Sequence, residues 1–298
     1  MYFGVLTMTI LAVVLSVLKG MSAILIADAL DSLIKPISLI TLTVLFIYLG
    51  INKNNIILAF ITSNIIITII ITTIILLTIA SRSYSKKIVR IEKILTIRDC
   101  ISFIAIGLMT YSFFQLDTLI LSMFRDQVVV GAYNMACNFV RLVIFIPMIV
   151  ISRAQPSIAH AHSNGNTRKV LSITKTSILQ SGICALIAAF LLIFFGETIL
   201  AFVSEKYRSQ HTALSILAIA HLFNAFIIII SGVLLMCKQQ KIVLASQALG
   251  LVICLPLYFI TIPLYGTIGA SATVATALAA TLISMIYLTR NWMRNFKQ

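Results

Sequence analysis

The stretch SRSYSKKIVRIEKILTI, residues 81–97, separates two sets of long apolar segments in this chain. Its basic residues are Arg82, Lys86, Lys87, Arg90 and Lys93, and Arg98 follows at once. Its apolar residues at helical spacing are Ile88, Ile91, Ile94 and Leu95. This pattern predicts an amphipathic helix on the inner leaflet of a membrane, with a plain cytoplasmic linker as the alternative. In either case the excess of Lys and Arg is typical of a cytoplasmic connection between transmembrane helices.

The composition excludes a soluble globular domain. The chain is 60% hydrophobic and only 10% charged, with a mean hydropathy of +1.10, whereas soluble domains carry roughly 25% charged residues. The net charge of +14 does not favour a nucleic-acid partner, because the basic residues are spread over the connections between apolar segments. Anionic lipid headgroups attract charges placed there. The sequence therefore predicts an all-α polytopic membrane protein, with membrane lipids as partners.

Apolar segments of the length that crosses the hydrocarbon core, about 20 residues, occur about nine times. The predicted transmembrane helices are residues 3–18, 33–50, 56–80, 98–122, 128–153, 172–195, 212–237, 241–262 and 267–289. We expect a partial N-terminal bundle (1–80), a basic linker (81–97) and a C-terminal bundle of about six helices (98–298). The connections are too short to fold as soluble domains, which argues against an attached ATPase and against a large catalytic loop.

The charge on alternate connections predicts the orientation of the chain. One set of connections holds about fifteen Lys and Arg residues and the other about four, which is a positive-inside signal. The larger set includes Arg290, Arg294 and Lys297 near the end of the chain. The C-terminus is therefore predicted to be cytoplasmic. With an odd number of spans, the N-terminus of this chain is predicted to be periplasmic.

Three polar residues inside one span fall on a single helix face. Asn134, Asn138 and Arg141 are spaced i, i+4 and i+7. Arg141 lies about a dozen residues from either end of its span, close to the bilayer midplane. A cation at that depth is costly and faces a wet cavity or a partner. The stripe is interpreted either as the wall of an anion-handling cavity or as a structural Arg paired with carbonyl groups of a neighbouring helix.

Two further ionisable residues are candidates for the same cavity. Asp117 lies toward the outer side of its span and is interpreted as a structural carboxylate or as one that takes part in ion coupling. Its depth differs from that of Arg141 by roughly 10 Å, so direct pairing of the two is not expected. Lys35 follows Asp31 at i, i+4, a spacing that favours an ion pair at a helix end over contact with a substrate.

Residue patterns for catalysis or for metal binding are not evident in the sequence. The five Cys residues show no C-x-x-C pair, and His160 and His162, expected in a loop, have no nearby Cys, Asp or Glu. Eight acidic residues in the whole chain leave little material for acid–base chemistry. We therefore expect no enzyme activity, no metal and no cofactor.

Three segments of the chain resemble polysaccharide flippases of the Wzx type, which belong to the multidrug/oligosaccharidyl-lipid/polysaccharide exporter superfamily. The first is GAYNMACNFVRLVIFIPMIVISRAQPSIAHAH (131–162), preceded by LDTLIL with Asp117. The second is PLYGTIGASATVATA (263–277), with Ser271 where the family carries an Ala. The third is KGMSAILIADALDSLIKPISLI (19–40). Their order and spacing extend the resemblance over nearly the whole chain.

The resemblance implies translocation of an undecaprenyl-diphosphate-linked oligosaccharide, such as an O-antigen repeat unit in lipopolysaccharide biosynthesis, across the bacterial inner membrane by alternating access. It implies a MATE-like architecture of two bundles, of which the first here lacks three helices. Arg141 suits a diphosphate, since guanidinium pairs bidentately with phosphate oxygens. Implied partners are the lipid-linked substrate, H+ or Na+ as a coupling ion, a polysaccharide polymerase and a chain-length regulator.

Other functions remain open at this point. A multidrug or lipid II exporter of the same superfamily is the nearest alternative, and a drug exporter is expected to carry acidic cavity residues in the first bundle. A truncated remnant without transport activity is a second alternative. A membrane-embedded O-antigen polymerase is less favoured, because it needs a long periplasmic loop with catalytic Arg or His.

Overall fold

The computed structural model describes residues 97–295 and, before them, separate helical positions between residues 37 and 73. The chain divides into two compact units, Met1–Glu92 and Lys93–Gln298. The three predicted spans of the first unit lie outside the described residues, apart from those separate positions. The same holds for Lys35 and, except for its last residue, for the predicted amphipathic helix 81–97. The structure of the second unit is described below.

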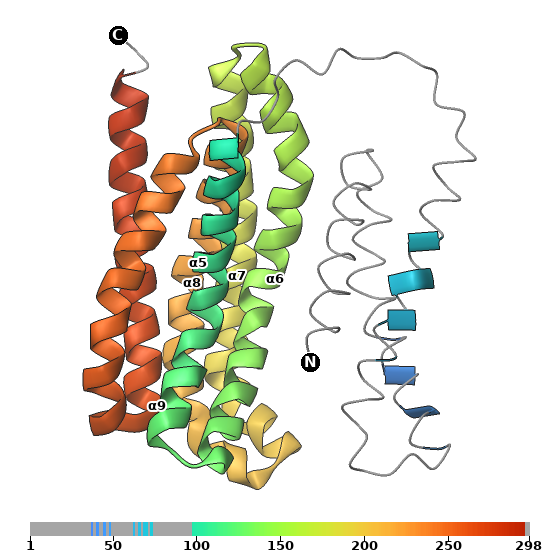
Figure 1. Cartoon of the computed structure of the whole chain (residues 1–298), viewed down its shortest axis with the longest axis vertical. Coiled ribbons are helices and arrows are strands. Elements are labelled where there is room, and N and C mark those ends of the chain that lie inside the picture. The colour runs from blue at the N-terminus through green and yellow to red at the C-terminus, as the bar shows by residue number, and fades with distance from the viewer. Residues whose placement is uncertain are drawn as a thin grey trace. The chain divides into compact units, whose positions relative to one another are not determined.

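The second unit is built from long helices (Figure 1). They are α5 (Ile97–Phe124), α6 (Gln127–Ser163), α7 (Thr167–Val203), the 3-10 helix η3 (Glu205–Gln210), α8 (His211–Met236) and α9 (Gln240–Asn295). Five of the described helices are long and apolar enough to cross a membrane, and residues 97–295 contain no strand. The prediction of an all-α polytopic membrane protein is thereby confirmed.

Helix α9 is two helices that meet at Gly266. This residue has φ +59° and ψ −127°, a left-handed conformation that glycine adopts without a steric penalty. The two halves run side by side from there, so that the hydroxyls of Thr261 and Thr273 lie 2.8 Å apart. The predicted spans 241–262 and 267–289 correspond to these two halves, and the short connection predicted between them is the turn at Gly266.

Helices α6 and α7 continue beyond the spans predicted for them. Each has 37 residues, or about 55 Å of helix, against a hydrocarbon core of about 30 Å. His160 and His162 therefore lie in the last turns of α6 rather than in a loop, which corrects the sequence prediction. The physical reason is a second small core at this end, where Ile151 and Ile158 are buried with Val170 against them. Packing between helices keeps the polar segment helical.

Helix α8 occupies the middle of the second unit. It packs against α6, α7 and α9, whereas α5 packs chiefly against α9. Leu214, Leu217 and Ile229 of α8 are fully buried. The main core also receives Tyr133 from α6 and Tyr258 from α9. This core fixes the position of α5 and α6, which carry the candidate site.

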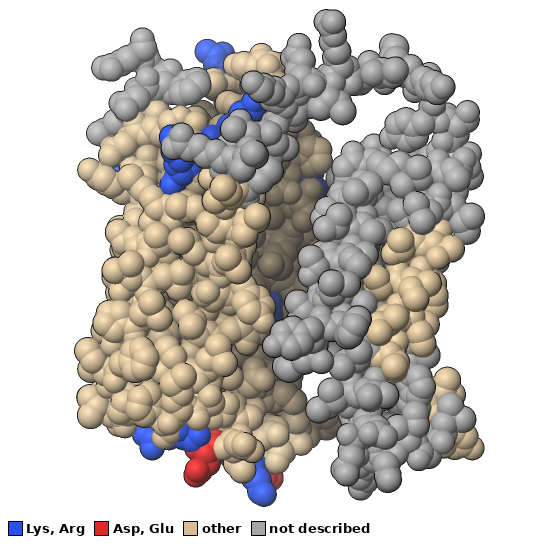
Figure 2. All heavy atoms as spheres, in the orientation of Figure 1, with Lys and Arg blue, Asp and Glu red and all other residues tan. Residues whose placement is uncertain are grey.

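The two ends of the bundle differ in charge. The α6–α7 turn, the α8–α9 turn and the end of α9 lie together at one end (Figure 1). The exposed charged residues in these segments and in the helix ends next to them are all basic: Arg153, Arg168, Lys169, Lys175, Lys238, Lys241 and Arg290. On the visible face of the other end, acidic and basic side chains occur together (Figure 2), and Arg208 pairs there with Glu197 at 2.6 Å. This asymmetry within one bundle has the form of a positive-inside distribution.

Candidate functional site

The polar stripe of α6 lies on the exposed side of that helix. The side chains of Asn134, Asn138 and Arg141 are exposed, whereas Tyr133 and Val140 on the opposite side are buried in the core. Among residues 97–295 the structure pairs no carboxylate with Arg141. Since an uncompensated cation on a lipid-facing surface at mid-span is costly, this face is suited to a water-filled cavity and to an anionic ligand.

An aromatic ring lies beside the guanidinium of Arg141. The guanidinium carbon is 5.9 Å from the centroid of the Phe114 ring on α5, within the range of a cation–π interaction. The ring of His221, on α8, is a further neighbour of Phe114, at a centroid distance of 6.2 Å. Arg141 thus belongs to an arrangement of side chains from α6, α5 and α8. Residue spacing within α6 does not indicate this arrangement.

Asp117 is buried on α5 and forms hydrogen bonds with α6 rather than an ion pair with Arg141. The Tyr133 hydroxyl donates to its Oδ2 at 2.9 Å, and the backbone N–H of Thr118 donates to its Oδ1 at 2.7 Å. The thiol of Cys137 lies 3.7 Å from the same Oδ2. Donors therefore reach both carboxyl oxygens, which favours the structural interpretation of Asp117 over a role in ion coupling.

The link between Asp117 and Tyr133 leads to a prediction for stability. Tyr133→Phe removes a buried donor to a carboxyl group without changing the volume of the ring, and we expect it to lower the free energy of unfolding by about 2 kcal/mol. Unfolding in SDS, followed by the fluorescence of Trp292, measures the change. Tyr265→Phe is the matched control, because Tyr265 is 67% exposed, and no change is expected for it. Equal values for the two variants would show that the bond contributes nothing.

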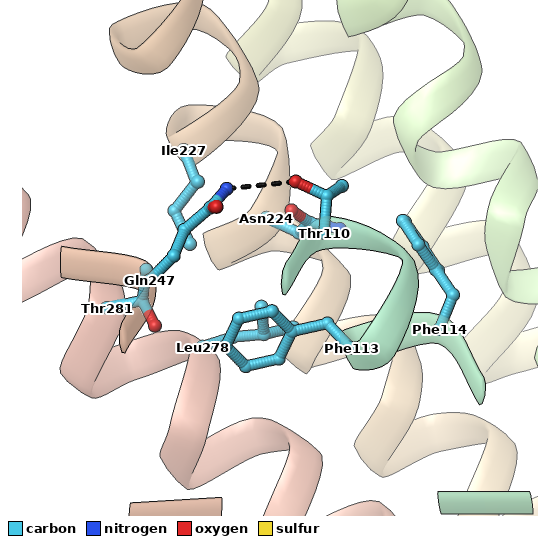
Figure 3. Close-up of a pocket in the computed structure, with 8 residues that line it drawn as sticks. All are labelled: Thr110, Phe113, Phe114, Asn224, Ile227, Gln247, Leu278 and Thr281. Atoms are coloured by element: carbon cyan, nitrogen blue, oxygen red, sulfur yellow. Dashed lines mark hydrogen bonds between the residues drawn. The ribbon is translucent and has the colours of Figure 1, made fainter. Parts of the chain in front are cut away.

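A small cavity with a mixed polar and apolar wall lies between α5, α8 and α9, and Phe114 is one of the residues that line it (Figure 3). Its volume of about 20 Å³ is enough for one water molecule. Gln247 donates from Nε2 to the Thr110 hydroxyl at 3.0 Å, and its buried Oε1 has no hydrogen-bond partner within the described residues. Asn224 and Thr281 add further polar atoms to the wall. The cavity was not predicted from the sequence, although Gln247, an amide inside an apolar span, was a signal for it.

The described residues offer little for metal binding or redox chemistry. No group of three or more His, Cys, Asp or Glu side chains within them is arranged to hold a metal ion. Four cysteines described by the structure, Cys137, Cys184, Cys237 and Cys254, are free thiols. What the site offers chemically is one cation, two amides and an aromatic ring on an exposed face.

Comparison with known proteins gives one family match. The family model named MatE matches residues 103–260, more than half of the 298 residues. The matched region spans α5 to α8 and the first half of α9, and so contains Asp117, Arg141 and Gln247. No solved structure shows a significant match to the chain.

Two curated relatives from the archaeon Haloferax volcanii are similar to the chain. One is named "Probable low-salt glycan biosynthesis flippase Agl15" and is 25% identical over 178 residues, which are 59% of this chain and 37% of the relative. The other is named "Probable flippase AglR" and is 27% identical over 190 residues, which are 60% of this chain and 37% of the relative. The matched part of this chain thus spans little more than a third of the length of these relatives. Their names are those of transporters and not of enzymes.

Proposed function

The chain belongs to the MatE family, and we propose that it translocates a lipid-linked oligosaccharide across a membrane. The observation that carries the proposal is the exposed stripe of Asn134, Asn138 and Arg141, with no carboxylate paired to its cation among residues 97–295. Arginine binds phosphate oxygens through two parallel N–H donors. The two amides supply neutral donors and acceptors for sugar hydroxyls. A diphosphate joined to a glycan presents both kinds of group.

The finer assignment follows from the resemblance to Wzx-type flippases. We propose an undecaprenyl-diphosphate-linked O-antigen or related repeat unit as the substrate, and the bacterial inner membrane as the location. The basic end of the second unit is proposed to face the cytoplasm and the mixed-charge end the periplasm. Within this scheme, residues 1–80 form part of a first bundle, 81–97 the linker and 98–298 the second bundle. H+ or Na+ as coupling ion, and a polymerase and a chain-length regulator as partners, are proposals from the same resemblance.

Two alternatives share the same family. A multidrug exporter would carry organic cations, for which an exposed Arg is repulsive, so the stripe disfavours that substrate class. A lipid II exporter handles the same diphosphate chemistry and differs in the glycan. A remnant without activity differs from both in transporting nothing.

A transport assay tests the proposed function. The chain is expressed in a bacterial strain that lacks its O-antigen flippase, and surface polysaccharide is measured. Restoration is the expected result, with uptake and efflux of a cationic dye unchanged. If the inserted protein exports the dye instead, the multidrug alternative is supported. If it does neither, the result favours the remnant, and restoration only when upstream codons are added would show that the activity needs more of the protein.

A further inference from the structure

We propose that Phe114 is a positioning residue that fixes the guanidinium of Arg141 for binding an anion. This inference rests on the proposed function, because it assumes that the stripe on α6 meets a phosphate-bearing ligand. The proposal is based on the position of the Arg141 guanidinium over the Phe114 ring, with 5.9 Å between the guanidinium carbon and the ring centroid. Phe114 comes from a different helix, α5, so the arrangement depends on the packing of the bundle.

Arg141 needs such support because its side chain is exposed. Among residues 97–295 no carboxylate holds it, and a long side chain that is free to sample rotamers must be ordered when a ligand binds, which weakens affinity. The Phe114 ring beside the guanidinium restricts those rotamers. An apolar ring does not take up the N–H donors as a carboxylate would, so they remain available to phosphate oxygens.

The Phe114 ring is itself fixed from the side of the core. His221 lies at a centroid distance of 6.2 Å, with the two ring planes inclined by 51°. The Nδ1 atom of His221 is 3.1 Å from the carbonyl oxygen of Leu217, so Nδ1 carries the proton and donates it. Since His221 is buried on the central helix α8, the ring of Phe114 has a rigid support. The contacts therefore run from α8 through α5 to the exposed cation on α6.

The test compares Phe114→Leu with Phe114→Tyr and Phe113→Leu. Leucine keeps an apolar side chain at the position but removes the π face, whereas tyrosine keeps it. Phe113 is the matched control, because it lines the same cavity and no cation lies over its ring among the described residues. Binding of inorganic pyrophosphate to the purified full chain is measured by calorimetry. We expect Phe114→Leu to raise Kd about threefold to tenfold, and the other two variants to bind as the unchanged protein does.

A spectroscopic readout measures the position of the guanidinium without a ligand. Arginine labelled with 13C at the guanidinium carbon is incorporated, and the Arg141 resonance is identified by its loss in Arg141→Lys. We expect Phe114→Leu to shift this resonance, since the ring current is removed, and Phe113→Leu to leave it in place. An unshifted resonance, or unchanged pyrophosphate affinity in a Phe114→Leu protein whose parent binds the probe, would overturn the positioning role. If the unchanged protein does not bind pyrophosphate, the assumption that the stripe binds a phosphate group is contradicted, and the resonance alone decides the role of Phe114.

Discussion

Gly269→Ala is expected to lower the free energy of unfolding by about 3 kcal/mol, at the upper end of the range for overpacked sites. A Cβ at this position would overlap the backbone carbonyl oxygen of Thr261 in the facing half of α9. A flexible side chain could move aside, but a helix backbone cannot do so unless the two halves separate. Unfolding in SDS measures the loss, with the fluorescence of Trp292 as the signal.

Gly107→Ala is the control for this prediction. Gly107 lies in the middle of α5, and a Cβ there would meet nothing within 4 Å. Alanine is the better helix former by about 0.8–1.0 kcal/mol in an exposed helix interior, so this variant is expected to be unchanged or slightly more stable. A destabilisation of similar size in both variants would mean that the replacement of a glycine in a helix causes the effect, and not the close approach of the two halves of α9.

The same hairpin shows how much of the fold the sequence could predict. The length of the apolar segments predicted the two spans on either side of Gly266, because hydrophobicity over about 20 residues is a local property of the sequence. Small residues such as Gly269 allow helices to pack closely, but the neighbour of Gly269, Thr261, is known only from the structure. The ends of α6 and α7 could not be predicted in this way. The last turns of α6 and the first turns of α7 are polar, and they are held by packing against one another and against α8.

In the candidate site, too, local features could be predicted from the sequence and contacts between helices could not. The stripe of Asn134, Asn138 and Arg141 follows from helical periodicity, which sequence spacing contains. The partner of Asp117 does not follow from periodicity, since Tyr133 reaches it from the next helix. The same is true of the hydrogen bond between Gln247 and Thr110, which are 137 residues apart in the chain. Contacts of this kind depend on where helices cross. The polar side chains of α5 and α6 could therefore be selected from the sequence, but the groups that they contact could not.

Arg141→Ala is expected to reduce transport of a diphosphate-linked substrate about tenfold to a hundredfold. Loss of the charge-assisted hydrogen bonds to phosphate costs about 1.5–3 kcal/mol. Each factor of ten in the rate corresponds to about 1.4 kcal/mol. The side chain is exposed and packs into no core, so the protein should remain folded and inserted. Initial rates of substrate translocation in reconstituted vesicles, at equal amounts of protein, measure the effect.

Two further variants separate the charge from the geometry of Arg141. Arg141→Lys keeps the charge but not the planar fork that binds two phosphate oxygens, so an intermediate rate is expected. Arg153→Ala removes an exposed Arg from the same helix at the basic end of the bundle, away from the stripe, and should leave the rate unchanged. If Arg153→Ala were as harmful as Arg141→Ala, the general positive charge of α6 would account for both effects. If Arg141→Ala transported at the normal rate, the stripe would have no part in binding the diphosphate.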